Sequence, residues 1–369
     1  MSTTSVRPAR LGPLDRLLPV WILIAMAAGI ALAVFAPGFG DLLHAASIGS
    51  VSIPIAIGLL VMMYPVLAKV RYTDAGGIAR DRRLLVTSLV LNWLIGPALM
   101  FALAWLLLPD LPEYRTGLII VGLARCIAMV LIWNDLACGD REAAAFLVAL
   151  NSVFQVLAFS ALGWFYLQVL PTWLGLPTTR AEFSVWAITL SVLVFLGIPL
   201  LAGYLSRTLG ERRHGRDWYE SVFLPRVSPL ALGGLLFTIV MLFALQGEQV
   251  IARPVDVARI ALPLLAYFAA MFLVGVLTGR LAGLGYERTA TLAFTAAGNN
   301  FELAIAVAIG TFGATSGQAL AGIVGPLIEV PVLVGLVYVA LWLRPRVFPA
   351  GSSGPGAEPP VVRTPILSR

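Results

Sequence analysis

The chain has 369 residues, of which 59% are hydrophobic and only 12% are charged, and its mean hydropathy is +0.92. Soluble domains carry about 25% charged residues, so this composition excludes a soluble globular protein and is typical of a polytopic membrane protein. The formal net charge of +6 does not indicate a nucleic-acid partner, because the basic residues are scattered between apolar segments and form no single patch.

The N-terminal segment 1–16 contains Arg7, Arg10 and Arg16 and precedes a first apolar stretch, Leu17 to Phe35. That stretch is longer than the ~7–15 apolar residues of a secretory signal peptide. We therefore expect it to be retained as the first membrane-spanning helix, with 1–16 as a cytoplasmic segment before it.

Ten apolar stretches have the length that a membrane-spanning helix needs, about 20 residues. In chain order they cover 17–35, 47–67, 84–108, 117–138, 143–170, 183–206, 227–246, 258–279, 289–310 and 318–343. Their continuous apolar character excludes the alternating strands, each about 10 residues long, of a membrane β-barrel. The longest predicted loop is 207–226. We predict an all-α transporter domain over 17–346 and a disordered cytoplasmic tail at 347–369, which is rich in Pro, Gly and Ser.

Lys and Arg are distributed unequally between the two sides of these spans. Twenty of them fall on the side that holds the N-terminus: Arg7, Arg10, Arg16, Lys69, Arg71, Arg80, Arg82, Arg83, Arg141, Arg207, Arg212, Arg213, Arg216, Arg226, Arg280, Arg288, Arg344, Arg346, Arg363 and Arg369. Four fall on the opposite side, namely Arg115, Arg180, Arg253 and Arg259. Since cytoplasmic loops carry the excess of Lys and Arg, we expect a multi-pass protein of the inner (plasma) membrane with both termini in the cytoplasm.

The predicted spans divide into two halves of five, about 17–170 and 183–343. An odd number of spans per half turns the second copy upside down in the membrane, which is the plan of many transporters. A weak sequence trace supports the repeat, because two segments of the first half are echoed in the second: SIPIAIGLLVMMY (52–64) by SPLALGGLLFTIVM (228–241), and ALNSVFQVLAF (149–159) by GPLIEVPVLVGL (325–336). We predict two inverted five-helix repeats.

Polar groups inside spans are the strongest pointers to function, because placing them in lipid is costly. Arg125 lies near the middle of the fourth span, where an arginine costs about 2.5–3.5 kcal/mol on insertion scales. Glu302 and Glu329 are the carboxylates within the ninth and tenth spans. Uncharged polar residues join them in the third, fifth and ninth spans: Asn92, Asn151, Asn299 and Asn300.

A structural interpretation of these residues pairs Arg125 with a glutamate and lets the asparagines bond between helices. The functional interpretation rests on position, since Arg125 and Glu302 lie in the corresponding fourth span of each half. Two costly residues at matching places indicate a shared site at the membrane midplane.

The ninth span carries a further hint in its helical spacing. Phe294, Gly298 and Glu302 follow one another at steps of four and would share one face of an intact helix. Asn300 would then point away from Glu302. If both line the site, the helix must be interrupted around 298–300, where AAGNN is a poor helix former. Together with a discontinuous fourth helix, it would cross the midplane as a broken span, the element that transporter sites typically use.

Cys126 is the chemically specific residue of the fourth span. A lone cysteine in a span is usually a small packing residue, and Cys138, beside Gly139 and Asp140, is interpreted in that way. Cys126 differs because Arg125 adjoins it, and a positive charge favours the thiolate, the form that binds soft metals. Trp133 lies seven residues on and would share its helix face. A thiolate in a polar pathway predicts a thiophilic substrate such as trivalent arsenic or antimony.

The sequence resembles the arsenite efflux permeases of the arsenical-resistance-three type, within the bile-acid, arsenite and riboflavin transporter superfamily. The resemblance runs from the first span to about Arg346. It rests on four segments: GLARCIAMVLIWNDLACGD (122–140), AAGNNFELAIAVAIGTFGA (296–314), VLNWLIGPALMFALAW (90–105) and GPLIEVPVLV (325–334). It implies ten spans and proton-coupled export of arsenite, with antimonite as a further substrate of some members.

The same resemblance implies that transport depends most on Cys126 and Glu302. Positions that match residues lining or supporting the family's pathway are Arg125, Trp133, Asn92, Asn151, Asn300 and Glu329. Phe294 is added as a candidate from its place in the ninth span. Cys126 is then a ligand of the arsenic atom and Glu302 the proton-coupling group.

The expected mechanism is antiport driven by the proton gradient, with no cofactor. The site would bind arsenite while Cys126 or Glu302 is deprotonated, and protonation from outside would expel it, since antiport requires that proton and substrate oppose each other's binding. The main alternative is a sodium-coupled organic-anion symporter of the same superfamily, which would not need Cys126. A pure channel and an intramembrane enzyme are further alternatives, although no histidine lies inside a predicted span.

Overall fold

The computed structural model describes residues 17–36, 38–48, 51–69, 81–127, 129–178, 185–313 and 315–348. The predicted N-terminal segment 1–16 and all but the first two residues of the predicted tail 347–369 lie outside these ranges. The regular secondary structure of the described chain is helical apart from one hairpin of two short strands, β1 (Ser47–Ile48) and β2 (Val51–Ser52), which pair antiparallel.

Six continuous helical stretches are long and apolar enough to cross a membrane. In chain order their helices and π-helical turns are α5 (Arg82–Val90), η3 (Leu91–Ile95) and α6 (Gly96–Leu107); α9 (Arg141–Trp164), η4 (Phe165–Val169) and α10 (Leu170–Trp173); α11 (Val185–Val192), η5 (Leu193–Gly197) and α12 (Ile198–His214); α13 (Arg216–Trp218), η6 (Tyr219–Phe223) and α14 (Leu224–Ala252); α15 (Pro254–Leu281); and α18 (Gly317–Val347). The chain is therefore a multi-pass membrane protein.

Two shorter apolar helices and two interrupted ones complete the bundle. The former are α2 (Leu18–Phe35) and α4 (Ile53–Ala68). The interrupted ones are the pairs α7 (Pro112–Leu123) with α8 (Met129–Leu136), and α16 (Tyr286–Ala297) with α17 (Phe301–Phe312). The second predicted span starts later than expected, at Ile53, because α3 (Gly38–Ala45) and the β-hairpin precede it.

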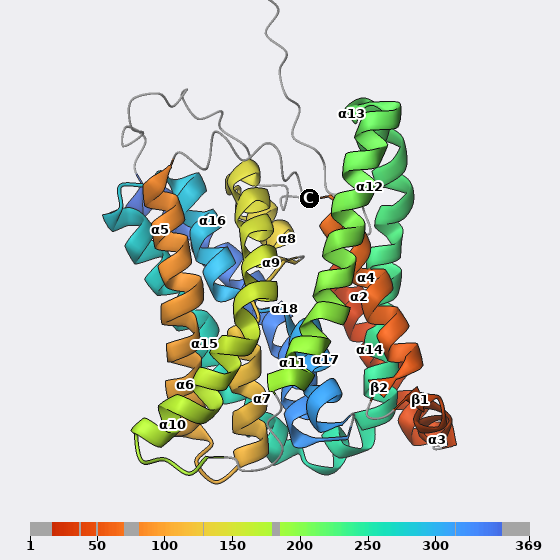
Figure 1. The fold of residues 1–369 in the computed structure, drawn as a ribbon. Helices are drawn as coiled ribbons and strands as arrows, with labels where there is room; N and C mark the ends of the chain where they lie inside the picture. Colours follow the sequence, from red (N-terminus) through yellow and green to blue (C-terminus); the bar gives the residue numbers. More distant parts are fainter. Residues whose placement is uncertain are drawn as a thin grey trace, which may run out of the picture.

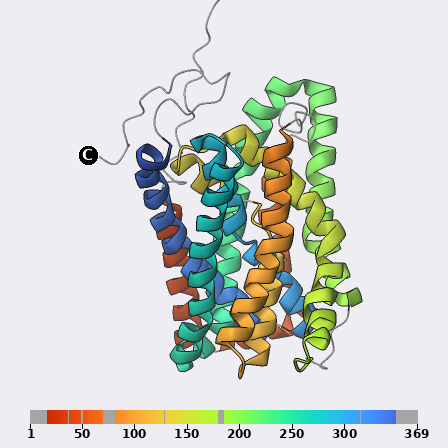
Figure 2. The ribbon, with the colours of Figure 1, turned by 90° about the vertical axis from the view of Figure 1, so that its left-hand side faces the viewer.

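The helices form two groups that stand side by side in Figure 1. One group packs α14 against α2 and α4, and α4 against α12. The other packs α15 against α6, α16 and α18, and α7 against α6 and α18. Helix α11 continues through η5 into α12 of the first group. It also touches α9 and α17, which pack against α16 and α18 of the second group. Figure 2, turned by 90°, shows that most helices run along one common direction, as in a membrane bundle.

Each π-helical turn stands just ahead of a proline. Pro97, Pro171, Pro199 and Pro225 are each the second residue after such a turn. A proline inside a helix offers no N–H and pushes against the carbonyl four residues back, and a π turn absorbs this conflict without ending the helix. The helices therefore continue across the prolines.

The loop predicted at 207–226 is wrong, since the chain stays helical there except at one residue. Helix α12 runs on to His214, Gly215 turns the chain with φ +86° and ψ 160°, and α13 follows at once. The buried Arg207 guanidinium holds this helical hairpin. It donates to the Lys69 carbonyl at 3.1 Å and to Glu220 at 2.9 Å. Arg207, which the sequence predicts to lie in a loop, is thus a buried cation with partners on both sides of the helical hairpin.

Gly215→Ala is expected to destabilise this hairpin. The backbone conformation of Gly215 is essentially confined to glycine and costs other residues about 1–3 kcal/mol. The melting temperature (Tm) of the purified protein in detergent should therefore fall by several degrees. Gly233→Ala is the matched control, because Gly233 lies in α14 with open space around it, and its Tm should stay the same or rise slightly. An unchanged Tm for Gly215→Ala would contradict the account.

Candidate functional site

The two interrupted helices meet at their breaks. The segment between α7 and α8 runs antiparallel to the segment between α16 and α17, with Arg125 opposite Asn299. The Cys126 N–H donates to the Gly298 carbonyl at 3.3 Å, and the Asn300 N–H donates to the Ala124 carbonyl at 3.0 Å. The interruption that the sequence predicted at 298–300 is therefore confirmed, and the fourth predicted span is broken as well.

Side chains satisfy the backbone groups that the breaks leave over. Asn299 donates its amide to the carbonyls of Val121, at 2.8 Å, and Ala124, at 3.2 Å. The Gln155 side-chain oxygen accepts the Arg125 N–H at 2.8 Å, from helix α9. Asn300 caps α17, because its side-chain oxygen accepts the Leu303 N–H. Unpaired backbone groups at membrane depth cost several kcal/mol each, so these contacts keep the breaks in place.

Arg125 is completely buried at the crossing. Its guanidinium donates to the Tyr267 hydroxyl at 2.7 Å, to the Ala296 carbonyl at 3.5 Å and to the Gly122 carbonyl. Among the described residues no carboxylate lies within ion-pair distance of it. The structural interpretation that paired Arg125 with a glutamate is thus wrong, and neutral oxygen atoms hold the cation instead.

Gly96 makes room for this arrangement. A Cβ atom at this position would stand 2.6 Å from Arg125 Nη1 and 3.0 Å from the Tyr267 hydroxyl oxygen. Gly96 follows the π-helical turn η3 and precedes Pro97. The absence of a side chain therefore lets α6 approach the guanidinium closely.

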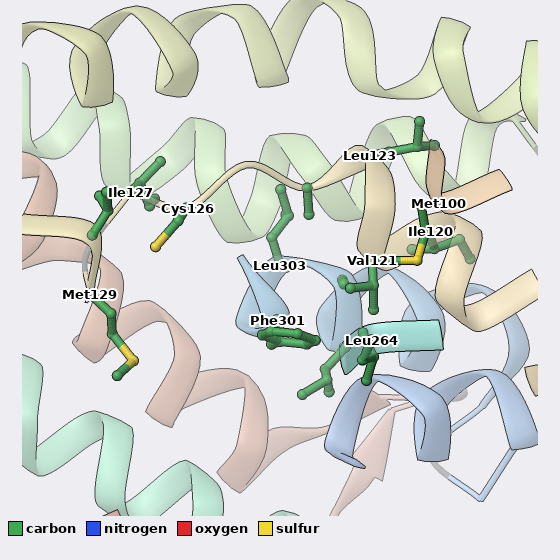
Figure 3. Packing of buried hydrophobic residues seen from close by; sticks show 14 of the residues in the cluster. Met100, Ile120, Val121, Leu123, Cys126, Ile127, Met129, Leu264, Phe301 and Leu303 are labelled. Atoms are coloured by element: carbon green, nitrogen blue, oxygen red, sulfur yellow. The ribbon is translucent and has the colours of Figure 1, made fainter. Parts of the chain in front are cut away.

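Cys126 lies in the extended segment before α8, with 3% of its surface exposed. Figure 3 shows it there, to the left of Leu303 and Phe301 of α17. The expectation that Cys126 and Trp133 share one helix face is wrong, because the helix begins only at Met129. The row Phe294–Gly298–Glu302 fails for the same reason, since α16 ends at Ala297.

The two carboxylates come from neighbouring helices. Glu302 is partly exposed in the first turn of α17. Glu329 is buried in α18, and its Oε1 has no hydrogen-bond partner among the described atoms. The two side chains are close enough to interact electrostatically. The crossing therefore places one cation and two carboxylates within a small region, without an ion pair between Arg125 and either acid.

The other predicted residues sit around this centre with partners of their own. Asn92, in η3, donates to the Ser88 carbonyl at 2.9 Å. The Asn151 side-chain oxygen accepts the indole N–H of Trp93 at 3.2 Å and lies one turn before Gln155 on α9.

The two aromatic candidates are fully enclosed. Trp133 of α8 is buried, and no hydrogen-bond partner of its indole N–H lies in the described chain. Phe294 packs edge-on against Phe272 of α15, with ring centroids 5.3 Å apart. The structure brings Arg125, Cys126 and Asn300 together at the breaks with Glu302 and Glu329 beside them, and leaves Asn92, Asn151, Trp133 and Phe294 in the surrounding shell.

Three residues of the crossing are absent from the sequence-based candidates: Gln155, Tyr267 and Gly96. Gln155 carried a usable signal, being an amide within an apolar span. Tyr267 and Gly96 carried none, because a tyrosine or a glycine in a span is ordinary until its contact with Arg125 is known.

On one side of the crossing, polar contacts join the half-helices α8 and α16 to each other. The Thr291 hydroxyl donates to the Asn134 side-chain oxygen at 2.7 Å. The Tyr286 hydroxyl donates to the Ala137 carbonyl, also at 2.7 Å, in the turn after α8. These two half-helices are therefore linked through side chains as well as through the paired breaks.

Comparison with known proteins gives a consistent result. Residues 56–253 match the model of the Sodium Bile acid symporter family. An arsenical-resistance protein, Acr3, of Corynebacterium glutamicum is 64% identical over 94% of this chain and 94% of its own length. An uncharacterised transporter of Synechocystis sp. is 36% identical over 88% of both chains. Another Acr3, from Alkaliphilus metalliredigens, is 31% identical over 89% of this chain and 93% of its own.

Tyr267→Phe should destabilise the protein while leaving the packing of the ring unchanged. The substitution removes the hydroxyl that accepts from Arg125, and a buried donor without its partner costs about 1–3 kcal/mol, or more when charged. The Tm in detergent should fall. Tyr338→Phe is the control, because Tyr338 is 54% exposed on α18. Equal Tm values for the two variants would show that the hydroxyl does not hold Arg125.

Proposed function

This chain belongs to the Acr3 arsenical-resistance proteins of the Sodium Bile acid symporter family, and from this premise we propose that it exports arsenite across the membrane and so confers arsenic resistance. The observation that carries the proposal is the 64% identity over 94% of both chains with an arsenical-resistance protein. The crossing supports it chemically, because it presents a thiol, Cys126, at the break of two helices.

The proposed topology has ten membrane crossings arranged as two inverted five-helix repeats. The six long helical stretches supply six of them, and α2 and α4 supply two more. Helix α2, with 18 residues, measures about 27 Å, close to the ~30 Å of a hydrocarbon core. The pairs α7–α8 and α16–α17 are the remaining two, crossing near the midplane. The excess of Lys and Arg on one side supports both termini in the cytoplasm for a protein of the inner membrane.

Arsenite near neutral pH is an uncharged trihydroxide, so the site needs a soft ligand more than an opposite charge. The Cys126 thiol would form the As–S bond as one As–O bond breaks, and the thiol proton would leave with the departing hydroxide as water. The chain has two cysteines, so capture by three thiols of one chain is excluded, and oxygen atoms must supply the other contacts. Such weak capture suits a transporter, which has to release its cargo.

Export against a gradient would be driven by proton antiport, without a cofactor. Proton and arsenite must then oppose each other's binding, and Glu302 is the proposed proton carrier because it stands in the first turn of α17, beside the crossing. Alternating access would come from the movement of one helix group against the other around the breaks.

Replacing Cys126 by Ser tests the thiol. In cells that lack their own arsenite exporter, Cys126→Ser should lower arsenite efflux by about tenfold or more, a loss of ~1.4 kcal/mol in substrate interaction. Cys138→Ser should transport normally, because Cys138 lies in the turn after α8, away from the breaks. Full efflux by Cys126→Ser, at matched expression, would remove the thiol from the mechanism.

Proton coupling is tested in everted membrane vesicles. Arsenite should accumulate inside vesicles that have a proton gradient and should leak out when a protonophore is added. Glu302→Gln, which cannot release a proton, should abolish accumulation against a gradient. Accumulation that persists in Glu302→Gln would show that Glu302 is not the proton carrier. A requirement for sodium instead of protons would indicate the symporter alternative, and movement only down the gradient would indicate a channel.

A further inference from the structure

Gly298 is a glycine whose backbone does not require glycine. It ends α16 with φ −71° and ψ 145°, an extended conformation open to every L-residue. Gly215 and Gly313, with φ values of +86° and +94°, are different, since their backbones do favour glycine. The reason for a glycine at 298 must therefore lie in the space that its missing side chain leaves.

That space adjoins the Cys126 side chain. A Cβ atom built on Gly298 would stand 3.0 Å from Cys126 Cβ and 3.5 Å from its sulfur, with the Phe294 carbonyl oxygen next at 3.4 Å. Two of the three nearest atoms thus belong to the thiol-bearing side chain. Any residue other than glycine would fill the flank of the sulfur on the side of the crossing.

The crossing has little freedom to yield to such a side chain. The two extended segments are joined by the bonds from Cys126 N–H to the Gly298 carbonyl and from Asn300 N–H to the Ala124 carbonyl. Gln155 holds the residue before Cys126 through its backbone N–H. A methyl group at 298 would therefore push the Cys126 side chain by a few tenths of an ångström, or else narrow the space at the sulfur.

We propose that Gly298 sets the size limit of the metalloid that binds Cys126, and that its missing side chain lets the site accept antimonite, the larger trihydroxide, as well as arsenite. This inference rests on the proposed function, since it needs arsenite to bind at the same sulfur. It makes Gly298 a specificity-determining position and not a ligand.

The test compares the two metalloids in everted vesicles for the original protein and for Gly298→Ala and Gly298→Ser. The KM for antimonite should rise at least tenfold in both variants, the KM for arsenite should change less than threefold, and the maximal rates should change little. Gly322→Ala is the control: its added Cβ would stand 2.8 Å from Ile305 Cγ1, so it crowds the α17–α18 contact without touching a thiol. It should affect both metalloids equally. An equal effect of the Gly298 variants on both, or no effect, overturns the proposal.

A second measurement needs no substitution at Gly298, so it does not depend on whether the Gly298 variants fold. In the Cys138→Ser background, with glycine at 298, antimonite and arsenite should each slow the alkylation of Cys126 by a small maleimide, at concentrations within about tenfold of each other, or ~1.4 kcal/mol. Protection by arsenite but not by antimonite contradicts the inference and leaves the proposed function intact. If neither metalloid protects Cys126 and the original protein transports neither, the proposed function itself has failed.

Discussion

Everything in this fold depends on how two broken helices satisfy their backbone at membrane depth. A helix that stops inside a bilayer exposes N–H and C=O groups that lipid cannot bind. Here the backbone groups of the two breaks bond each other, since Cys126 pairs with Gly298 and Asn300 with Ala124. The side chains of Asn299 and Gln155 bond further backbone groups of the breaks. The two breaks are thereby fixed to one another, although more than 170 residues separate them along the sequence.

The buried cation follows from the same constraint. Arg125 sits on the first break with its guanidinium held by carbonyls and by Tyr267, so its charge has no ionic partner in the described part of the chain. A buried charge of this kind is costly unless it is fully hydrogen-bonded. Its place at the crossing therefore depends on the Tyr267 hydroxyl and the two backbone carbonyls that accept from it.

Much of this could be predicted from the sequence, because membrane segments and costly polar residues leave clear local signals. The apolar stretches located the helices, and AAGNN located the break near Gly298. The features that the sequence did not predict correctly depend on contacts between distant segments. The predicted loop at 207–226 is a helical hairpin, which Arg207 holds through bonds to Lys69 and Glu220. Cys126 lost its helical spacing to Trp133 because its segment pairs with α16–α17, and Tyr267 had no local sign of its bond to Arg125.

We propose that the paired breaks present one thiol to a trivalent metalloid. X-ray absorption at the arsenic edge tests it directly, on the purified Cys138→Ser protein loaded with arsenite. We expect a first shell of one sulfur with oxygen atoms, and a shell of oxygen alone once Cys126 is also replaced by Ser. An arsenic shell without sulfur while Cys126 is present would contradict it.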